Sequence, residues 1–125
     1  MSIEIDTELE RILNAYSDDV KEVLKNSVDE IAKATVKDLK ETSPKRRKRG
    51  GYAKTWAQRE NKSDKLNYSR IVYNKKNYRL THLLERGHLT RDGIKRTRAI
   101  PHIAPAEEKA INNFLEKVKN NIEKL

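Results

Sequence analysis

The sequence lacks cysteine altogether and contains few glycines, prolines and large aromatic side chains. Without cysteine, neither disulfide bonds nor thiolate chemistry can contribute, which suits a cytosolic origin. No stretch approaches the roughly 18 apolar residues of a membrane-spanning helix. Acidic residues follow Met1, where a secretory signal would place basic and then apolar residues. We therefore expect a soluble, non-exported protein whose 125 residues form a single domain.

Motifs typical of enzymes are also missing. There is no glycine-rich phosphate loop, no nucleophile elbow and no pair of carboxylates beside a recognisable pocket. The histidines His82, His88 and His102 match no metal-ligand spacing. Glu85 follows His82 by one helical turn, which predicts a surface hydrogen bond between them. We therefore predict no enzymatic activity, no cofactor and no metal site.

One enzymatic alternative stays open from the residues alone. A small basic ribonuclease of the bacterial toxin kind would hold phosphates with cations and transfer protons with histidine or tyrosine. Its candidate residues are His82, His88, Tyr73 and Arg98, although their spacing does not single them out.

Charge is abundant in this chain and is unevenly distributed. The formal net charge is +9. Residues 1–44 carry 6 basic and 11 acidic residues, whereas residues 45–98 carry 18 basic and 4 acidic residues. An acidic N-terminal part therefore precedes a strongly basic middle part. This segregation predicts that the middle part meets a polyanionic surface or an acidic protein partner.

Apolar residues recur at helical spacing from residue 7 to residue 42 and predict a long amphipathic helix. Asp6 is the expected N-cap, and Ser43-Pro44 ends the helix because the residue before proline avoids helical geometry. About 35 helical residues would span about 53 Å, whereas a compact domain of this length measures about 36 Å across. Either the helix breaks near residues 17–19, or part of it packs on another subunit.

The middle of the chain predicts a small sheet. Side chains alternate in character along residues 52–59 and 68–73, which indicates an antiparallel pair of strands joined by a turn at residues 60–65. Asp92-Gly93 is a turn signal, so residues 94–100 can add a third strand. Two or three strands are stable only when helices cover one face.

Two further helices follow from the spacing of apolar residues. A short buried helix is expected from residue 77 to residue 86, with Gly87 as its left-handed C-terminal cap. A C-terminal helix is expected over residues 105–124, with Pro105 in its first turn. Its apolar stripe consists of Ile111, Phe114, Leu115, Val118, Ile122 and Leu125. The fold class is therefore α+β, with a long N-terminal helix, an antiparallel β-hairpin or small three-stranded sheet with a short helix, and a C-terminal amphipathic helix.

A run of five cations predicts a flexible basic loop at residues 45–51. The cations are Lys45, Arg46, Arg47, Lys48 and Arg49. They form either a solvated loop or a contact with anions such as nucleic acid phosphates. Tyr52 and Trp56 could stack on unpaired bases. We instead expect Trp56 in the core, because the chain has only one Trp and one Phe to fill it.

Short sequence motifs resemble a known family and occur in its order. The motifs are Ser43-Pro44-Lys45, Gly51-Tyr52-Ala53-Lys54-x-Trp56, Ile71-Val72-Tyr73-Asn74-Lys75, Leu80-Thr81-His82-Leu83-Leu84-Glu85-x-Gly87-His88 and Pro101-His102-Ile103-Ala104-Pro105-Ala106. They resemble the tail-component family of long-tailed phages and prophages, the neck or tail-completion proteins of the Hong Kong lambdoid type. The chain departs from that family in its longer, more basic segment at residues 46–51.

The resemblance extends over about residues 1–124 and implies a non-enzymatic structural protein of the virion. Such a protein is made in the bacterial cytoplasm and assembled at the interface between head and tail, in a homo-oligomeric ring. Its expected partners are other neck, connector or tail proteins, and the basic loop can contact phage DNA non-specifically. No membrane is involved. The alternative from the residues alone is a separate nucleic-acid-binding protein, whose affinity would fall steeply with salt.

Overall fold

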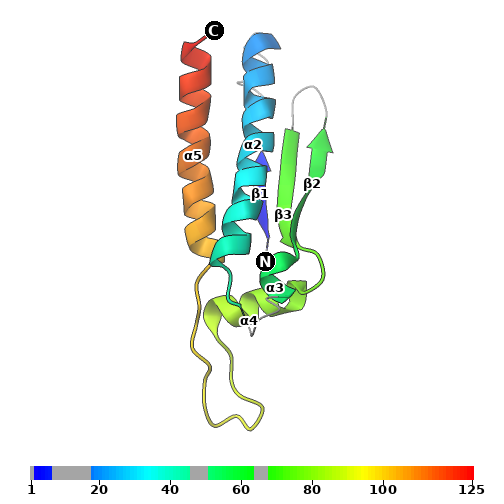
Figure 1. Cartoon of the computed structure of the whole chain (residues 1–125), viewed down its shortest axis with the longest axis vertical. Helices are drawn as coiled ribbons and strands as arrows, with labels where there is room; N and C mark the ends of the chain where they lie inside the picture. Colours follow the sequence, from blue (N-terminus) through cyan, green and yellow to red (C-terminus); the bar gives the residue numbers. More distant parts are fainter. Residues whose placement is uncertain (1, 7–17, 46–50, 64–67) are drawn as a thin grey trace.

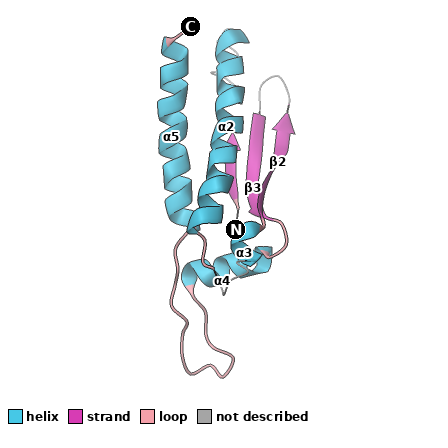
Figure 2. Ribbon diagram, viewed as in Figure 1, coloured by secondary structure: helices cyan, strands magenta, loops and turns pink. Residues whose placement is uncertain are grey.

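The computed structural model describes residues 2–6, 18–45, 51–63 and 68–125, and it has the predicted α+β architecture. Its elements are β1 Ile3–Asp6, α2 Asp18–Thr42, α3 Gly51–Lys54, β2 Trp56–Ser63, β3 Tyr68–Asn74, the 3-10 helix η1 Tyr78–Leu80, α4 Thr81–Arg86 and α5 Ile103–Glu123. The long helices α2 and α5 run side by side, and α2 packs against both α5 and the sheet (Figures 1 and 2). The short helices α3 and α4 lie at one end of these layers.

The sheet contains three antiparallel strands in the order β1-β3-β2. The central strand is β3, where the fully buried Val72 pairs with Ile3 on one side and with Gln58 on the other. The third strand therefore comes from the N-terminal end of the chain. The prediction of a third strand at residues 94–100 is wrong, because that segment pairs with residues 88–90 instead of with the sheet.

Helix α2 supplies much of the core from one of its faces. Its buried side chains are Ser27, Val28, Ile31, Ala32, Thr35 and Leu39. The hydroxyls of Ser27 and Thr35 each donate to a carbonyl oxygen four residues earlier at 2.7 Å, so both polar side chains are satisfied in the core. The 25 residues of α2 span about 38 Å.

The described part of the predicted long helix is α2, which extends from Asp18 to Thr42. The predicted break near residues 17–19 stays a prediction. Residues 7–17, the first part of the predicted helix, lie outside the described residues. Asp6, the predicted N-cap, is the last residue of β1.

Both predicted ends of the strand that corresponds to β2 are wrong. Residues 51–54 form the helix α3 rather than the start of a strand, and β2 continues through residues 60–63, where a turn is predicted. Tyr52 and Ala53 are both buried, whereas successive residues of a strand point to opposite faces. The carbonyl oxygen of Tyr52 accepts hydrogen bonds from the Thr55 N–H and the Asn74 side chain, which closes this helical turn.

The predicted short helix is present as η1 and α4, and it packs on the core through Leu84. The prediction that it is buried is wrong, because η1 has no buried residue and only Thr81 and Glu85 of α4 are buried. The helix ends at Gly87, whose φ of 74° is positive as expected, although its ψ of 171° is extended rather than left-handed helical. A Cβ at this position would lie 2.4 Å from the carbonyl oxygen of Thr97. Glycine is therefore needed where the chain leaves α4 and passes close to the backbone of residue 97.

Helix α5 begins at Ile103 and has Pro105 in its first turn, as predicted. The structure divides its predicted apolar stripe. Ala106 and Ala110 are buried, and Phe114 packs at the edge of the core, whereas Ile111, Leu115, Ile122 and Leu125 are exposed. Among the described residues, no helix combines the length and apolar character needed to cross a membrane.

Candidate functional site

The Glu85 carboxylate, which lies on α4, caps the N-terminus of α5. Its Oε1 accepts hydrogen bonds from the backbone N–H groups of His102 and Ile103 at 2.7 and 2.8 Å, and its Oε2 accepts one from Ala104 at 3.0 Å. These N–H groups have no partner within the helix and form its positive end. Burial raises the pKa of the Glu85 carboxyl, but the three backbone donors outweigh it and hold the pKa below 4.5. Glu85 therefore joins two helices as a buried anion.

His102 is buried beside this carboxylate and connects it to Tyr52. Its Nδ1 lies 2.8 Å from the Ile100 carbonyl oxygen and 3.0 Å from Glu85 Oε1, and both of these groups are acceptors. Nδ1 therefore carries a proton, and Nε2 accepts the hydrogen bond of the Tyr52 hydroxyl at 2.7 Å. Burial, and secondarily the Glu85 charge, raise the pKa of Tyr52 well above its usual value. The Tyr52 hydroxyl therefore remains a hydrogen-bond donor.

Trp56 completes this buried group and is in the core, as predicted. Its side chain is 2% exposed, and its ring makes edge contacts with those of Tyr52 and His102. The indole Nε1 donates to Ser43 Oγ at 2.8 Å, just after the end of α2. We call Ser43, Tyr52, Trp56, Glu85 and His102 the buried junction, because these residues join α2, α3, β2, α4 and α5.

The buried junction explains why short motifs far apart in the sequence belong together. Each of its five members lies in one of the motifs quoted above. Asn74 adds a further link, since its side chain accepts from Thr55 and Asn77 and donates to the Tyr52 carbonyl. All of these contacts hold secondary-structure elements together.

The residues of the ribonuclease hypothesis lie on separate elements, with Tyr73 on β3, His82 on α4, and His88 and Arg98 in the segment 88–98. His82 is exposed on α4, whereas His102 is buried in the junction. His88 contacts Thr97 through Nδ1 at 3.1 Å, and Tyr73 lies under the Arg59 guanidinium. The described residues contain no group of three or more potential metal ligands. The predicted surface hydrogen bond between His82 and Glu85 is wrong, because the Glu85 carboxylate is buried against the N-terminus of α5.

The stacking residues of the nucleic-acid hypothesis are not available for bases. Tyr52 is 8% and Trp56 2% exposed, so neither ring presents a face to solvent. Of the predicted basic loop, Lys45 is exposed and its Nζ donates to the Glu41 carbonyl oxygen. Arg46, Arg47, Lys48 and Arg49 lie outside the described residues, so their predicted anion or subunit contact stays a prediction.

Residues 88–98 form a hairpin that projects beyond the end of the helical layer, and we call it the projecting hairpin (Figure 1). Leu89 and Arg96 pair across it, and the Thr90 N–H donates to the Lys95 carbonyl oxygen at 2.7 Å. The Gly93 N–H donates back to the Thr90 carbonyl oxygen at 2.8 Å, with Gly93 at a positive φ of 73°. The tip carries Ile94, which is 78% exposed.

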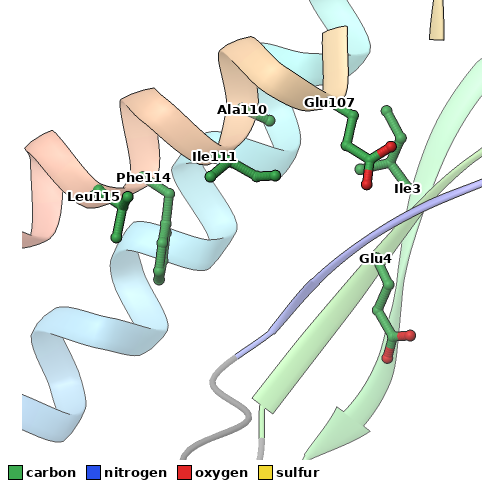
Figure 3. A pocket seen from close by; sticks show the side chains of 7 residues that line it. All are labelled: Ile3, Glu4, Glu107, Ala110, Ile111, Phe114 and Leu115. Atoms are coloured by element: carbon green, nitrogen blue, oxygen red, sulfur yellow. The ribbon is translucent and has the colours of Figure 1, made fainter. Parts of the chain in front are cut away.

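A second surface feature lies between α5 and β1. A cavity of about 180 Å³ is lined by Ile3, Glu4, Glu107, Ala110, Ile111, Phe114 and Leu115, and we call it the α5 groove. Figure 3 shows the side chains of Ile111, Phe114 and Leu115 extending from one side of α5, with the Glu107 carboxylate near Ile3. The Glu4 side chain points away from α5, and its carboxylate accepts from Asn61 at 2.9 Å. The groove is therefore mainly apolar with an acidic end.

Sequence reasoning missed the role of Glu85 and the split of the α5 stripe. Glu85 accepts a hydrogen bond from the N–H of His102, which lies 17 residues later in the sequence. Local capping patterns relate only neighbouring residues, so they cannot detect this contact. The sequence shows only that no Ser, Thr, Asp or Asn directly precedes α5, where His102 is the N-cap residue. For the projecting hairpin, the signal was the presence of Leu89 and Ile94 in an otherwise basic segment with a turn at Asp92-Gly93.

Comparison with known proteins gives one finding. The family model described as "Bacteriophage HK97-gp10, putative tail-component" matches residues 7–87, about two thirds of the chain. The match includes the motifs around Ser43, Trp56, Asn74 and Glu85 and ends before His102. No curated protein and no solved structure matches the chain.

Proposed function

Because the chain belongs to the HK97 gp10-like family of bacteriophage tail components, we propose that it completes the tail at the phage neck, where the DNA-filled head is joined. It acts there as a structural virion protein in a homo-oligomeric ring. The family match carries this proposal. It agrees with a buried junction whose polar groups are used to hold elements together rather than to perform chemistry.

The exposed apolar side chains support a protein that works inside an assembly. Ile94, Leu115 and Leu89 are 78%, 62% and 60% exposed. Leu89 and Ile94 share the projecting hairpin, and Leu115 lines the α5 groove. Large apolar side chains that share a surface mark sites that a partner covers. The acidic N-terminal and basic middle parts of the sequence further support head-to-tail contacts between charged surfaces.

The proposed partners are copies of the chain and other neck, connector or tail proteins. The protein is made in the bacterial cytoplasm and becomes part of the virion. The cations at residues 45–49 face either a neighbouring subunit or the DNA that passes through the ring. Any contact with DNA is then non-specific and depends on charge.

The proposal is tested by interrupting the gene in the phage or prophage and imaging the particles by electron microscopy. We expect DNA-filled heads and separate tails, because the joining component is absent. Supplying the intact gene from a plasmid should restore joined particles, which controls for effects on neighbouring genes. Normally joined, infectious particles without the protein would contradict the proposal.

A further inference from the structure

The projecting hairpin is a preformed apolar protrusion. Side-chain hydrogen bonds add to the backbone pairing of the hairpin. The Asp92 carboxylate accepts hydrogen bonds from the Thr90 hydroxyl and from the Ile94 N–H at 2.5 and 3.0 Å. The Thr97 hydroxyl accepts from the His88 N–H at 2.8 Å, which closes the base of the hairpin. A protrusion that is already ordered loses little conformational entropy when it binds. Its exposed Leu89 and Ile94 are therefore positioned for a partner.

The α5 groove has the size and polarity that such a protrusion needs. A cavity of about 150 Å³ is large enough to hold a benzene molecule, so the groove of about 180 Å³ can accept an isoleucine side chain. Phe114 is half-buried at its base, and Ile111 and Leu115 are 53% and 62% exposed at its edge. Covering these side chains would remove apolar surface from water.

The charges of the two features are complementary. Residues 86–98 contain five cations, Arg86, Arg91, Lys95, Arg96 and Arg98, and one acidic residue, Asp92. The groove ends at Glu107, and the exposed Glu108 is one helical turn from Ile111. Cations around an apolar tip thus match carboxylates around an apolar groove. Opposite charges on two apolar surfaces favour one orientation of contact.

We propose that the projecting hairpin of one copy inserts Ile94 into the α5 groove of a second copy, with its cations beside Glu107 and Glu108. The contact joins two different surfaces, so the first copy keeps a free groove and the second copy keeps a free hairpin. Such head-to-tail contacts form a closed ring when the rotation between copies closes. This inference rests on the proposed function, since it identifies the contact that builds the neck ring.

Disulfide trapping tests the contact directly, because the chain has no cysteine of its own. We would mix the purified Ile94→Cys and Ile111→Cys proteins, oxidise them, and follow the linked dimer on a non-reducing gel. The matched control replaces Ile111→Cys with Asn112→Cys, since Asn112 is also exposed but points about 100° away around the helix. Docking would hold the two thiols close to each other, so we expect linkage at least about tenfold faster than in the control.

Two results would overturn the proposed contact. Equal linkage rates with Ile111→Cys and Asn112→Cys would show random collision, and rapid self-linkage of Ile111→Cys would show a symmetric contact between α5 helices. Charge reversal provides a second check. Glu107→Lys with Glu108→Lys should slow the linkage at least about tenfold, and adding Arg91→Glu with Lys95→Glu to the partner should restore it.

The same experiment separates this inference from the proposed function. If the protein is found at the neck of particles but shows no preferred linkage, the hairpin contact is wrong and the proposed function stands. If the linkage is specific but particles join normally without the protein, the contact is correct and the neck function is wrong.

Discussion

At the scale of single residues, Glu85 has the clearest role. It is 7% exposed and accepts three backbone hydrogen bonds from the first turn of α5. A side chain beyond the helix thereby does the work that an N-cap residue usually does. The sequence could not reveal this role, because the partners are brought together only when α4 packs beside the start of α5.

Replacing Glu85 should therefore destabilise the fold. We expect Glu85→Gln to reduce the free energy of unfolding by about 2 kcal/mol, because charged hydrogen bonds to buried N–H groups are lost. Urea unfolding followed by circular dichroism measures this change. His82→Ala on the exposed side of the same helix is the control, with an expected change within about 0.5 kcal/mol. Equal effects of the two substitutions would refute the capping role.

The Glu85 cap should also make stability depend on pH. Its folded pKa is held below 4.5, so its stabilising contribution is fully present above pH 4.5 and is lost as pH falls through the folded pKa. Asp29 also has a lowered pKa, owing to hydrogen bonds from Tyr68 and Arg70 that outweigh its burial. The measurement is therefore the difference in unfolding free energy between the wild type and Glu85→Gln. That difference should shrink below pH 4.5, and a constant difference would contradict the account.

At the scale of elements, the helices α2, α4 and α5 and the hairpin β2-β3 could be predicted, because their spacing of apolar residues is set by local geometry. The helix α3 lies where the sequence predicts part of a strand. The short strand β1 could not be predicted, since residues 3–6 become a strand only by pairing with the distant β3. The error at residues 94–100 has the same origin. Their pattern fits a strand, but their partners are residues 88–90, and Ile94 has no sheet face to cover.

Substituting Gly87 tests how α4 connects to the projecting hairpin. Gly87→Ala should reduce the free energy of unfolding by about 2 kcal/mol or more, because its φ and ψ are nearly restricted to glycine. Its new Cβ would also collide with the Thr97 carbonyl oxygen. Gly93→Ala is the matched control, because Gly93 also has a positive φ but has open space around it. Thermal and urea unfolding of both variants should rank Gly87→Ala as the more damaging, and the reverse order would count against this packing.

The basic run at residues 45–49 gives a prediction for DNA contact. If these cations meet phosphates, the affinity for double-stranded DNA should fall with salt. We then consider the slope of the logarithm of affinity against the logarithm of salt concentration. Replacing Arg46, Arg47, Lys48 and Arg49 by alanine should make this slope less steep by up to about 0.9 per cation. Alanine at the exposed Lys33, Lys37 and Lys40 of α2 is the control and should leave the slope nearly unchanged. An unchanged slope in the first variant would show that the run does not contact DNA phosphates.

At the scale of the whole molecule, the α+β fold and the family resemblance could be predicted, whereas the binding surfaces could not. Helical spacing identifies Ile111, Phe114 and Leu115 as one stripe, but only packing shows that Phe114 meets the core and its neighbours do not. The molecule thus combines a firmly joined interior with two unpartnered apolar features. This combination supports the proposal that the protein works as one part of a larger assembly.

The location of the protein in intact particles tests the central claim most directly. The C-terminal Leu125 is 65% exposed, so an affinity tag added there should be accessible to a gold label. Electron microscopy of tagged, infectious particles should then show gold at the junction between head and tail. Gold along the tail or at its tip, or complete particles that contain no tagged protein, would contradict a role in joining the head to the tail.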